Sequence, residues 1–179
     1  MDNGPDLGVR AVVVAGTEPA TDVNQTSSKE RCDMPAVYEL RYSECLALLH
    51  AGVFGRVAVS APDGPHVVPV NYSVLDGAVM VRTAPDGLIA KFGSGVAVAF
   101  EIDHVDYSRH RGWSVMVRGT TAVVDDLAEV ARIRSAWEPV PWASGDRSLL
   151  LKLPWTEVTG RRLGDGWLPM SELPVRRTV

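Results

Sequence analysis

The residues best suited to chemistry follow an apolar stretch of the chain. Arg82 and Thr83 precede the turn-like sequence APDG and a short helical stretch that carries Lys91. A guanidinium, a hydroxyl, exposed amides at a helix start and an ammonium are the charge-assisted donors that a phosphate prefers. These residues predict a phosphate site, and a capped helix with surface charges fits them as well.

Two other segments combine strand patterning with residues that can bind a ligand. In the sequence VPVNY, Pro69 removes one backbone donor from a strand, which predicts an edge or a bulge where a ligand can bond to free backbone groups. Trp113 and Ser114 begin another strand, and the Trp113 ring can form one wall of a site for a planar ligand. The structural alternatives are a simple barrel irregularity at Pro69 and a core or interface position for Trp113.

Other catalytic patterns are absent from the sequence, which contains no GxSxG, P-loop, HExxH or CxxC motif. Cys45 lies among leucines in an expected helix, which predicts a buried and unreactive thiol. Acidic and histidine side chains gather near one expected hairpin, where a solvated loop explains them better than a metal site. We expect no bound metal there; these residues are Asp103, His104, Asp106 and His110.

Composition limits the classes of partner. The chain has 179 residues, with 18 basic and 22 acidic side chains and a net charge of −4, so one domain without a general attraction to nucleic acid or anionic membrane is expected. Its longest apolar runs fall short of the roughly 20 residues that span a bilayer. The N-terminus lacks the features of a signal peptide. We therefore expect a cytoplasmic protein without nucleic-acid or membrane partners.

Short alternating segments separated by turn dipeptides predict an antiparallel sheet. The expected strands are 53–60, 66–74, 78–83, 96–102, 113–124, 149–153 and 157–162, and the expected helical stretches are 43–51, 88–92 and 127–137. Turn and cap residues mark their boundaries: Asp-Gly hairpins at 63–64 and 76–77, a left-handed helix end at Gly52, a bend or bulge at Gly119 and a helix cap at Asp126.

These elements predict a mostly β fold with short helices, in which six or seven strands form a small closed barrel. Side chains fill the interior of a barrel this small, so a ligand is expected outside it, in a groove or at a subunit interface. Residues 1–35 fit a flexible N-terminal tail, in which the valines at 12–14 could add an edge strand. Residues 36–165 form the expected barrel domain, and residues 166–179 form a C-terminal tail.

Four segments, in this order and spacing, resemble the pyridoxamine 5'-phosphate oxidase-like flavin-binding split-barrel family: VPVNYSVLDGAVMVRTAPDG, VAFEIDHVD, GWSVMVRG and EVTGRRL. The resemblance runs from about Leu40 to Leu163. It implies a six-stranded antiparallel split β-barrel of the FMN-binding type. It also implies a homodimer, with FMN bound in clefts to which both subunits contribute.

The resemblance further implies which residues contact the cofactor: Pro69, Val70, Asn71, Tyr72, Arg82, Thr83, Trp113 and Ser114. In relatives a basic residue follows a Ser at the start of the short helix, whereas this chain has Gly87 and Leu88 there. Lys91 lies three positions later, on a similar face of the helix, and is the expected substitute. The residues with which true pyridoxamine-phosphate oxidases hold their substrate are incomplete, so that reaction is not expected.

The resemblance favours an FMN-binding oxidoreductase or flavin reductase that transfers hydride through the flavin ring to an unidentified small molecule. Since the ring carries the hydride, no catalytic side chain is assigned. A deazaflavin-dependent reductase is the alternative, and its longer anionic tail would need further basic residues. The arginines available for that tail are Arg56, Arg118, Arg161 and Arg162. A third interpretation is a non-catalytic flavin or haem protein or sensor, with His66 or His110 as the haem ligand.

Overall fold

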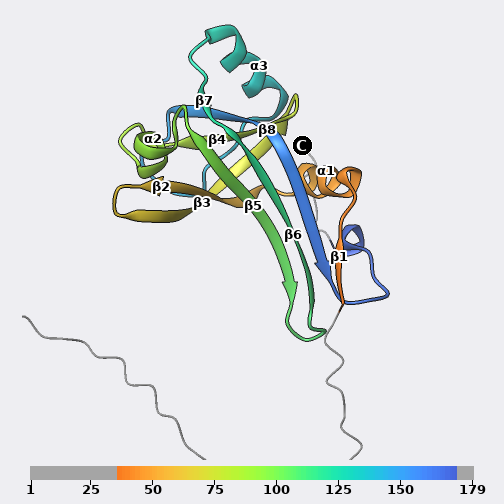
Figure 1. The fold of residues 1–179 in the computed structure, drawn as a ribbon. Helices are drawn as coiled ribbons and strands as arrows, with labels where there is room; N and C mark the ends of the chain where they lie inside the picture. Colours follow the sequence, from red (N-terminus) through yellow and green to blue (C-terminus); the bar gives the residue numbers. More distant parts are fainter. Residues whose placement is uncertain (1–35, 173–179) are drawn as a thin grey trace, which may run out of the picture. The chain divides into compact units, whose positions relative to one another are not determined.

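The computed structural model describes residues 36–172, and Figure 1 shows their arrangement. The strands are β1 (Val37–Glu39), β2 (Phe54–Ala61), β3 (Gly64–Leu75), β4 (Ala78–Thr83), β5 (Ala97–Asp106), β6 (Arg111–Thr120), β7 (Ala122–Val123) and β8 (Leu149–Leu163). The helices are α1 (Tyr42–Ala51), α2 (Leu88–Gly93), α3 (Leu127–Trp137) and the 3-10 helix η1 (Pro169–Glu172).

Six antiparallel strands close into a ring, as the sequence predicted. Their order is β8-β4-β3-β2-β5-β6, and β6 pairs again with β8 to close the barrel. The ring is split at β3, because residues 64–71 pair with β2 whereas residues 72–75 pair with β4. Beyond the ring, β5, β6 and β8 continue side by side as a long ribbon (Figure 1).

The barrel interior is filled with side chains, which confirms the expectation from its size. Alternate residues of each strand point inward, and Tyr72 and Phe100 meet there edge to face with their ring centroids 4.8 Å apart. A cavity lined by these inner strands measures only about 10 Å³. This space is too small for a cofactor, so a ligand must bind outside the barrel.

The turns follow the sequence closely, with one exception. Asp76 and Gly77 have φ of 49° and 71°, the left-handed pair that a two-residue hairpin requires. Asp126 accepts a hydrogen bond from the backbone N–H of Glu129 at 2.7 Å and caps α3. Gly52, however, is not left-handed, since its φ is −84°. A side chain there would collide with the Tyr72 hydroxyl, so close packing rather than backbone conformation requires glycine.

Two expected strand boundaries were wrong. The strands expected at 149–153 and 157–162 are one strand, β8, which continues through Pro154. The strand expected over 113–124 is divided at Thr121 into β6 and β7. The register between β6 and β8 shifts at Arg118 and Gly119, which confirms the predicted bulge. The register shift skips Thr156 of β8, and Pro154 still pairs with Ala78 of β4, so the proline does not end the strand.

The region expected to be a hairpin loop is largely strand. β5 continues to Asp106, so Asp103, His104 and Asp106 are strand residues and only His110 lies in the following turn. In that turn Asp106 accepts hydrogen bonds from Ser108 and Arg109. The sequence did not predict β1, a short strand that pairs with the end of β8.

The fold continues past residue 165. Trp167 is 8% exposed and belongs to the barrel's core cluster, and η1 follows it. The expected N-terminal tail of residues 1–35, with its valine cluster, lies outside the described residues, as do residues 173–179. Among the described residues, no helix is long and apolar enough to cross a membrane.

Candidate functional site

The split leaves one edge of β3 open. Residues 64–71 pair with β2 on one side, and no other described strand pairs with them on the second side. The backbone N–H of Tyr72 donates to the carbonyl of Val53 at 3.1 Å, which shows that even-numbered residues in this part of β3 direct their polar groups toward β2. Odd-numbered residues therefore direct theirs to the open edge.

Two prolines lie on this open edge, at odd-numbered positions. Pro65 and Pro69 lack an N–H where no neighbouring strand requires one, which confirms the edge predicted from Pro69. The edge consequently offers mostly carbonyl acceptors, with the N–H of Val67 as a donor between them. A row of acceptors in which two donors are missing is poorly suited to adding a strand and well suited to a small ligand with its own donors and acceptors.

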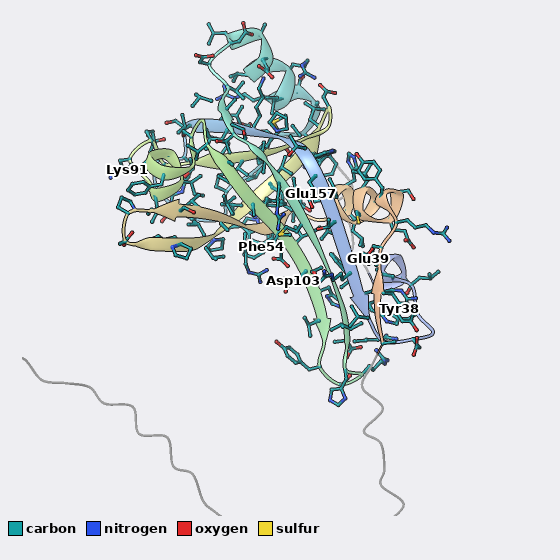
Figure 2. The ribbon with its side chains drawn as sticks, in the orientation of Figure 1. Tyr38, Glu39, Phe54, Lys91, Asp103 and Glu157 are labelled. Carbon is teal, nitrogen blue, oxygen red and sulfur yellow. The ribbon has the colours of Figure 1, made fainter. Side chains whose placement is uncertain are left out.

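Arg82 and Thr83, which end β4, point to opposite faces of the strand. Thr83 is buried and shares the inner face with Val81, and Gly87 passes close to its hydroxyl. Arg82 lies on the outer face, beneath the segment that follows α3. Lys91 is exposed on α2 (Figure 2), where no hydrogen bond or ion pair engages it among residues 36–172. The predicted phosphate-binding side chains therefore do not share one face.

The guanidinium of Arg82 already has partners. Its Nε donates to the carbonyl of Arg147 at 2.8 Å, and its Nη1 donates to the carboxylate of Glu138 at 3.1 Å. Glu138 also accepts from Arg134 at 3.2 Å. Arg82 thus holds both ends of residues 138–147, the irregular segment between α3 and β8, against the barrel.

Asn71 holds the middle of the same segment. Its Oδ1 accepts the backbone N–H of Trp142 at 2.8 Å, and its Nδ2 donates to the carbonyl of Val53 at 3.3 Å. Trp142 stacks on Phe54 with the ring centroids 5.6 Å apart and the planes at 9°. The sequence analysis assigned no role to Phe54, Trp142 or Glu138, and the only local signal was an aromatic residue within the loop-like sequence PVPWASG.

The remaining predicted cofactor-binding residues either point into the barrel or lie on a strand that does not neighbour β3. Val70 and Tyr72 point into the barrel; the Tyr72 hydroxyl donates to the carbonyl of Leu49 at 2.8 Å, and burial raises the pKa of Tyr72 above its usual range. Trp113 is 6% exposed, with its indole N–H lacking an acceptor among the described residues. Trp113 and Ser114 lie on β6, which β2 and β5 separate from β3 in the ring.

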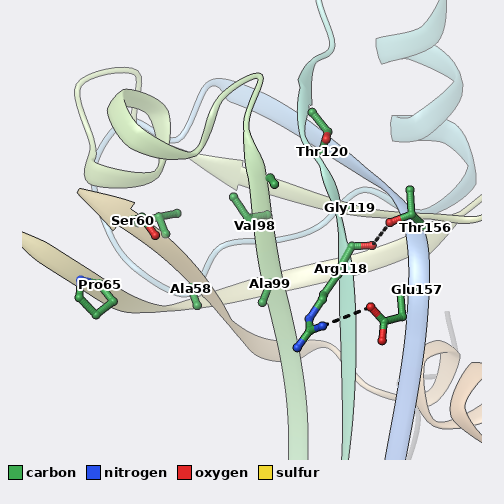
Figure 3. A pocket seen from close by; sticks show the side chains of 12 residues that line it. Ala58, Ser60, Pro65, Val98, Ala99, Arg118, Gly119, Thr120, Thr156 and Glu157 are labelled. Carbon is green, nitrogen blue, oxygen red and sulfur yellow. Dashed lines mark hydrogen bonds and ion pairs between the residues drawn. The ribbon is translucent and has the colours of Figure 1, made fainter. Parts of the chain in front are cut away.

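A groove lies on the outer face of the barrel, at a position that was not predicted. It has a volume of about 440 Å³ and is lined by residues of β2, β3, β5, β6 and β8, among them Ala58, Ala99, Arg118 and Glu157. Figure 3 shows Arg118 and Glu157 paired along one side of it, at 3.3 Å. None of the predicted cofactor-binding residues lines it. Residues from five strands form the groove, so no local pattern indicates it.

Three of the four arginines considered for a longer cofactor tail already have partners. Arg56 pairs with Glu101 at 3.1 Å and with Asp103 at 2.7 Å, and burial raises the pKa of the Glu101 carboxyl. Arg118 pairs with Glu157, while Arg162 lies over the Tyr38 ring at 4.2 Å.

The two histidines considered for haem lie in turns or next to them. His66 is bonded to Asp63 at 2.9 Å, and His110 is an exposed turn residue with φ of 49°. Residues 36–172 contain no cluster of three or more histidine, cysteine, aspartate or glutamate side chains that could hold a metal.

Comparisons of sequence and structure identify a matching family and several similar proteins. The family model described as Pyridoxamine 5'-phosphate oxidase matches residues 41–162. The FAD binding protein of Mycobacterium smegmatis is 30% identical over 70% of this chain and 97% of its own, with a TM-score of 0.59. A putative pyridoxamine 5'-phosphate oxidase of Corynebacterium glutamicum is 32% identical over 73% of this chain and 96% of its own, with a TM-score of 0.60. The uncharacterized protein Rv0080 of Mycobacterium tuberculosis is 33% identical over 132 residues, which are 71% of this chain and 86% of that protein.

Proposed function

This chain belongs to the pyridoxamine 5'-phosphate oxidase family, and on that basis we propose that it binds a flavin along the open edge of β3 and acts as an oxidoreductase. The observation that supports this most directly is the one-sided pairing of residues 64–71. The polar edge of a flavin ring carries both acceptors and an N–H donor, and the edge of β3 offers carbonyls together with the N–H of Val67. The residues present therefore fit the ring.

The phosphate end of the flavin would be held by Lys91, whose side chain is exposed and whose charge no described residue neutralises. Thr83 is buried on the inner face of β4, so it would support the start of the segment that leads to α2 and would not contact the phosphate. Arg82 would not contact the phosphate, because its guanidinium holds residues 138–147 through Glu138 and Arg147. When bound, the flavin supplies hydride transfer; the chain's residues bind it, orient it and limit its contact with water.

FMN is the form of flavin that we propose first, since it needs only one phosphate site. The M. smegmatis relative is named as an FAD binding protein, so FAD is the immediate competitor. A deazaflavin with a long anionic tail is less well supported, because Arg56 and Arg118 are paired with carboxylates and Arg162 lies over the Tyr38 ring.

A homodimer with shared clefts is part of the proposal. The predicted cofactor residues lie on opposite sides of the outer face of β2 and β5: Pro69 and Asn71 on β3, Trp113 and Ser114 on β6. A second copy that packs its β6 side against the β3 edge would bring the two sets to one flavin. Two-fold symmetry would then form two equivalent clefts.

A non-catalytic binding protein or sensor is the second candidate. Two features favour it: Leu88 stands where the resemblance to the family implies a basic residue, and the Arg82 guanidinium is already engaged by Glu138. Both would weaken phosphate binding. This candidate predicts weak flavin affinity or none, and no turnover with added reductants.

The test is a fluorescence titration of cofactor-stripped protein with FMN, FAD and the deazaflavin cofactor in parallel. Val67→Pro removes the edge N–H between the two prolines without removing a bond to β2, so it should weaken flavin binding roughly 3- to 10-fold, the effect of one hydrogen bond. Val67→Ala keeps that N–H and serves as the matched control. Equal affinity in the two variants would contradict binding along this edge, and no binding of any flavin would favour the second candidate.

A further inference from the structure

The aromatic stack formed by Phe54 and Trp142 has no role in the fold's core. Trp142 is 69% exposed and Phe54 is 41% exposed. Their planes differ by 9° and their centroids lie 5.6 Å apart, so Phe54 supports one face of the indole while much of the indole surface remains open. An exposed stack of two large aromatic side chains has an unfavourable solvation free energy, and this stack lies outside the core of the barrel.

Three side chains hold this tryptophan in place from the barrel. Ser73 donates to the carbonyl of Trp137 at 2.7 Å, Arg82 binds Glu138 and the carbonyl of Arg147, and Asn71 accepts the backbone N–H of Trp142. The segment 138–147 is irregular, yet it is bonded at its start, its middle and its end. Such anchoring presents an exposed ring in one fixed orientation, which reduces the entropy lost when a ligand stacks on it.

The stack also adjoins the open edge of β3. Phe54 pairs directly with Asn71, the last residue of the part of β3 that pairs with β2 alone. Asn71 therefore links the edge to the stack through one side chain. The exposed indole face is apolar, and the charge of Arg56, on the same face of β2 as Phe54, is neutralised by Glu101 and Asp103.

We propose that Trp142, supported by Phe54, is the stacking platform for an uncharged, planar aromatic substrate that enters beside the flavin. Asn71 and Arg82 are positioning residues for this platform. The part of this inference that makes the bound molecule a substrate of the flavin rests on the proposed function. The binding itself rests only on the stack, because the platform is preformed without a cofactor.

The test uses the full chain with ¹⁵N-labelled tryptophan and the neutral bicyclic molecule coumarin as probe. The protein has five tryptophans, and the indole N–H resonance that vanishes in Trp142→Phe is assigned to Trp142. Titration with coumarin should shift that resonance in a saturable way, with smaller shifts for the other four. The titration is run on flavin-loaded and on stripped protein, and flavin content is measured from absorbance in each variant.

The variants separate stacking from folding. Trp142→Ala should weaken coumarin binding roughly 3- to 10-fold, as expected for the loss of one aromatic pair, and Trp142→Phe should retain most of the affinity. Val140→Ala removes an exposed apolar side chain from the same segment and serves as the matched control. Flavin affinity should be the same in all three variants.

Three results would overturn the proposal. One is a Trp142 resonance that does not respond while others do, and another is unchanged coumarin affinity in Trp142→Ala. The third is conversion of Trp142→Ala to a smaller species in sedimentation, which would identify the stack as a contact between copies of the chain. Failure of the wild type to bind any flavin, with coumarin binding retained, would instead refute the proposed function and leave the platform intact.

Discussion

Individual side chains of β3 and β4 divide into two groups according to the face on which they lie. Tyr72 and Thr83 are buried on the inner side of the barrel, whereas Asn71 and Arg82 point outward and bind residues 138–147. Neighbouring residues on a strand alternate between faces. Two polar residues that are adjacent in the sequence can therefore have unrelated functions. Experiments on single residues can separate these functions.

Tyr72→Phe should lower stability and leave flavin affinity unchanged. The mutation removes a buried hydrogen bond to the carbonyl of Leu49, which leaves that carbonyl without its hydroxyl partner and costs about 1–2 kcal/mol. Urea unfolding measures the loss, with the exposed Tyr107→Phe as the control. A weaker flavin affinity without loss of stability would mean that the hydroxyl reaches the cofactor.

Arg82→Ala and Lys91→Ala should behave differently. Without Arg82, Glu138 loses a partly buried partner and residues 138–147 lose two anchors, so stability should fall by about 1–3 kcal/mol. Lys91 is exposed and unpaired among the described residues, so Lys91→Ala should leave the melting temperature unchanged and lower flavin affinity by a similar free energy. Thermal melts and flavin titrations of both variants check this contrast, and identical profiles would contradict it.

Ser108→Ala should make the protein less sensitive to acid. Hydrogen bonds from Ser108 and then Arg109 hold the pKa of the Asp106 carboxyl well below its usual range. A lowered carboxyl pKa stabilises the fold above the unfolded value of about 3.9, and this contribution is lost as the pH falls toward the folded pKa. NMR titration should show a higher Asp106 pKa in Ser108→Ala than in the wild type or in Ser135→Ala. An unchanged pKa would assign the shift to the remaining hydrogen bonds.

At the scale of elements, β3 and β8 each pair with two different strands along their length. β3 changes its partner from β2 to β4 after residue 71, which opens the edge. β8 pairs with β4 in its first half and with β6 in its second half, and so closes the ring. The change of partner in β8 occurs beside the bulge at Gly119, where the two strands must approach closely.

Gly119→Ala should disrupt this closure. A side chain at position 119 would collide with the backbone carbonyl of Pro154, which a rotamer change cannot relieve. We expect a loss of about 3 kcal/mol, the upper range for inserting one methyl group into a packed site. Gly95→Ala is the control, since it has a positive φ but open space around it. Chemical denaturation compares the two, and equal losses would show that the bulge adapts.

At the scale of the whole molecule, the ring order separates the two groups of predicted cofactor residues. β3 and β6 are separated by β2 and β5, whose outer face carries small side chains and the groove described above. A homodimer that shares its clefts would cover part of this face. A charged substitution on this face therefore tests whether the dimer forms.

The wild type should sediment at twice its chain mass of 19.3 kDa. Ala58 lines the groove and lies on the outer face, so Ala58→Asp should fold normally but bury an unpaired charge in the dimer, which weakens association by several kcal/mol. Leu127→Asp, on exposed α3, is the matched control. Sedimentation equilibrium measures both variants. A monomeric wild type would contradict the shared clefts.

The sequence by itself determined the barrel, most element boundaries and the open edge. Alternation, Asp-Gly turns and the proline at position 69 are local signals, because each acts through the conformation of a few adjacent residues. The wrong boundaries have the same origin: Pro154 would end an isolated strand, whereas pairing with β4 before the register shift and with β6 after it keeps β8 continuous.

Only the tertiary structure decided what the polar residues contact. The partner of Arg82 lies 56 residues away at Glu138, and that of Asn71 lies 71 residues away at Trp142. No local pattern encodes a contact between a strand and a distant irregular segment, since packing of the whole ring brings them together. The sequence therefore identified Asn71 and Arg82 as candidate site residues, and the folded chain shows that both hold an exposed tryptophan beside the open edge of β3.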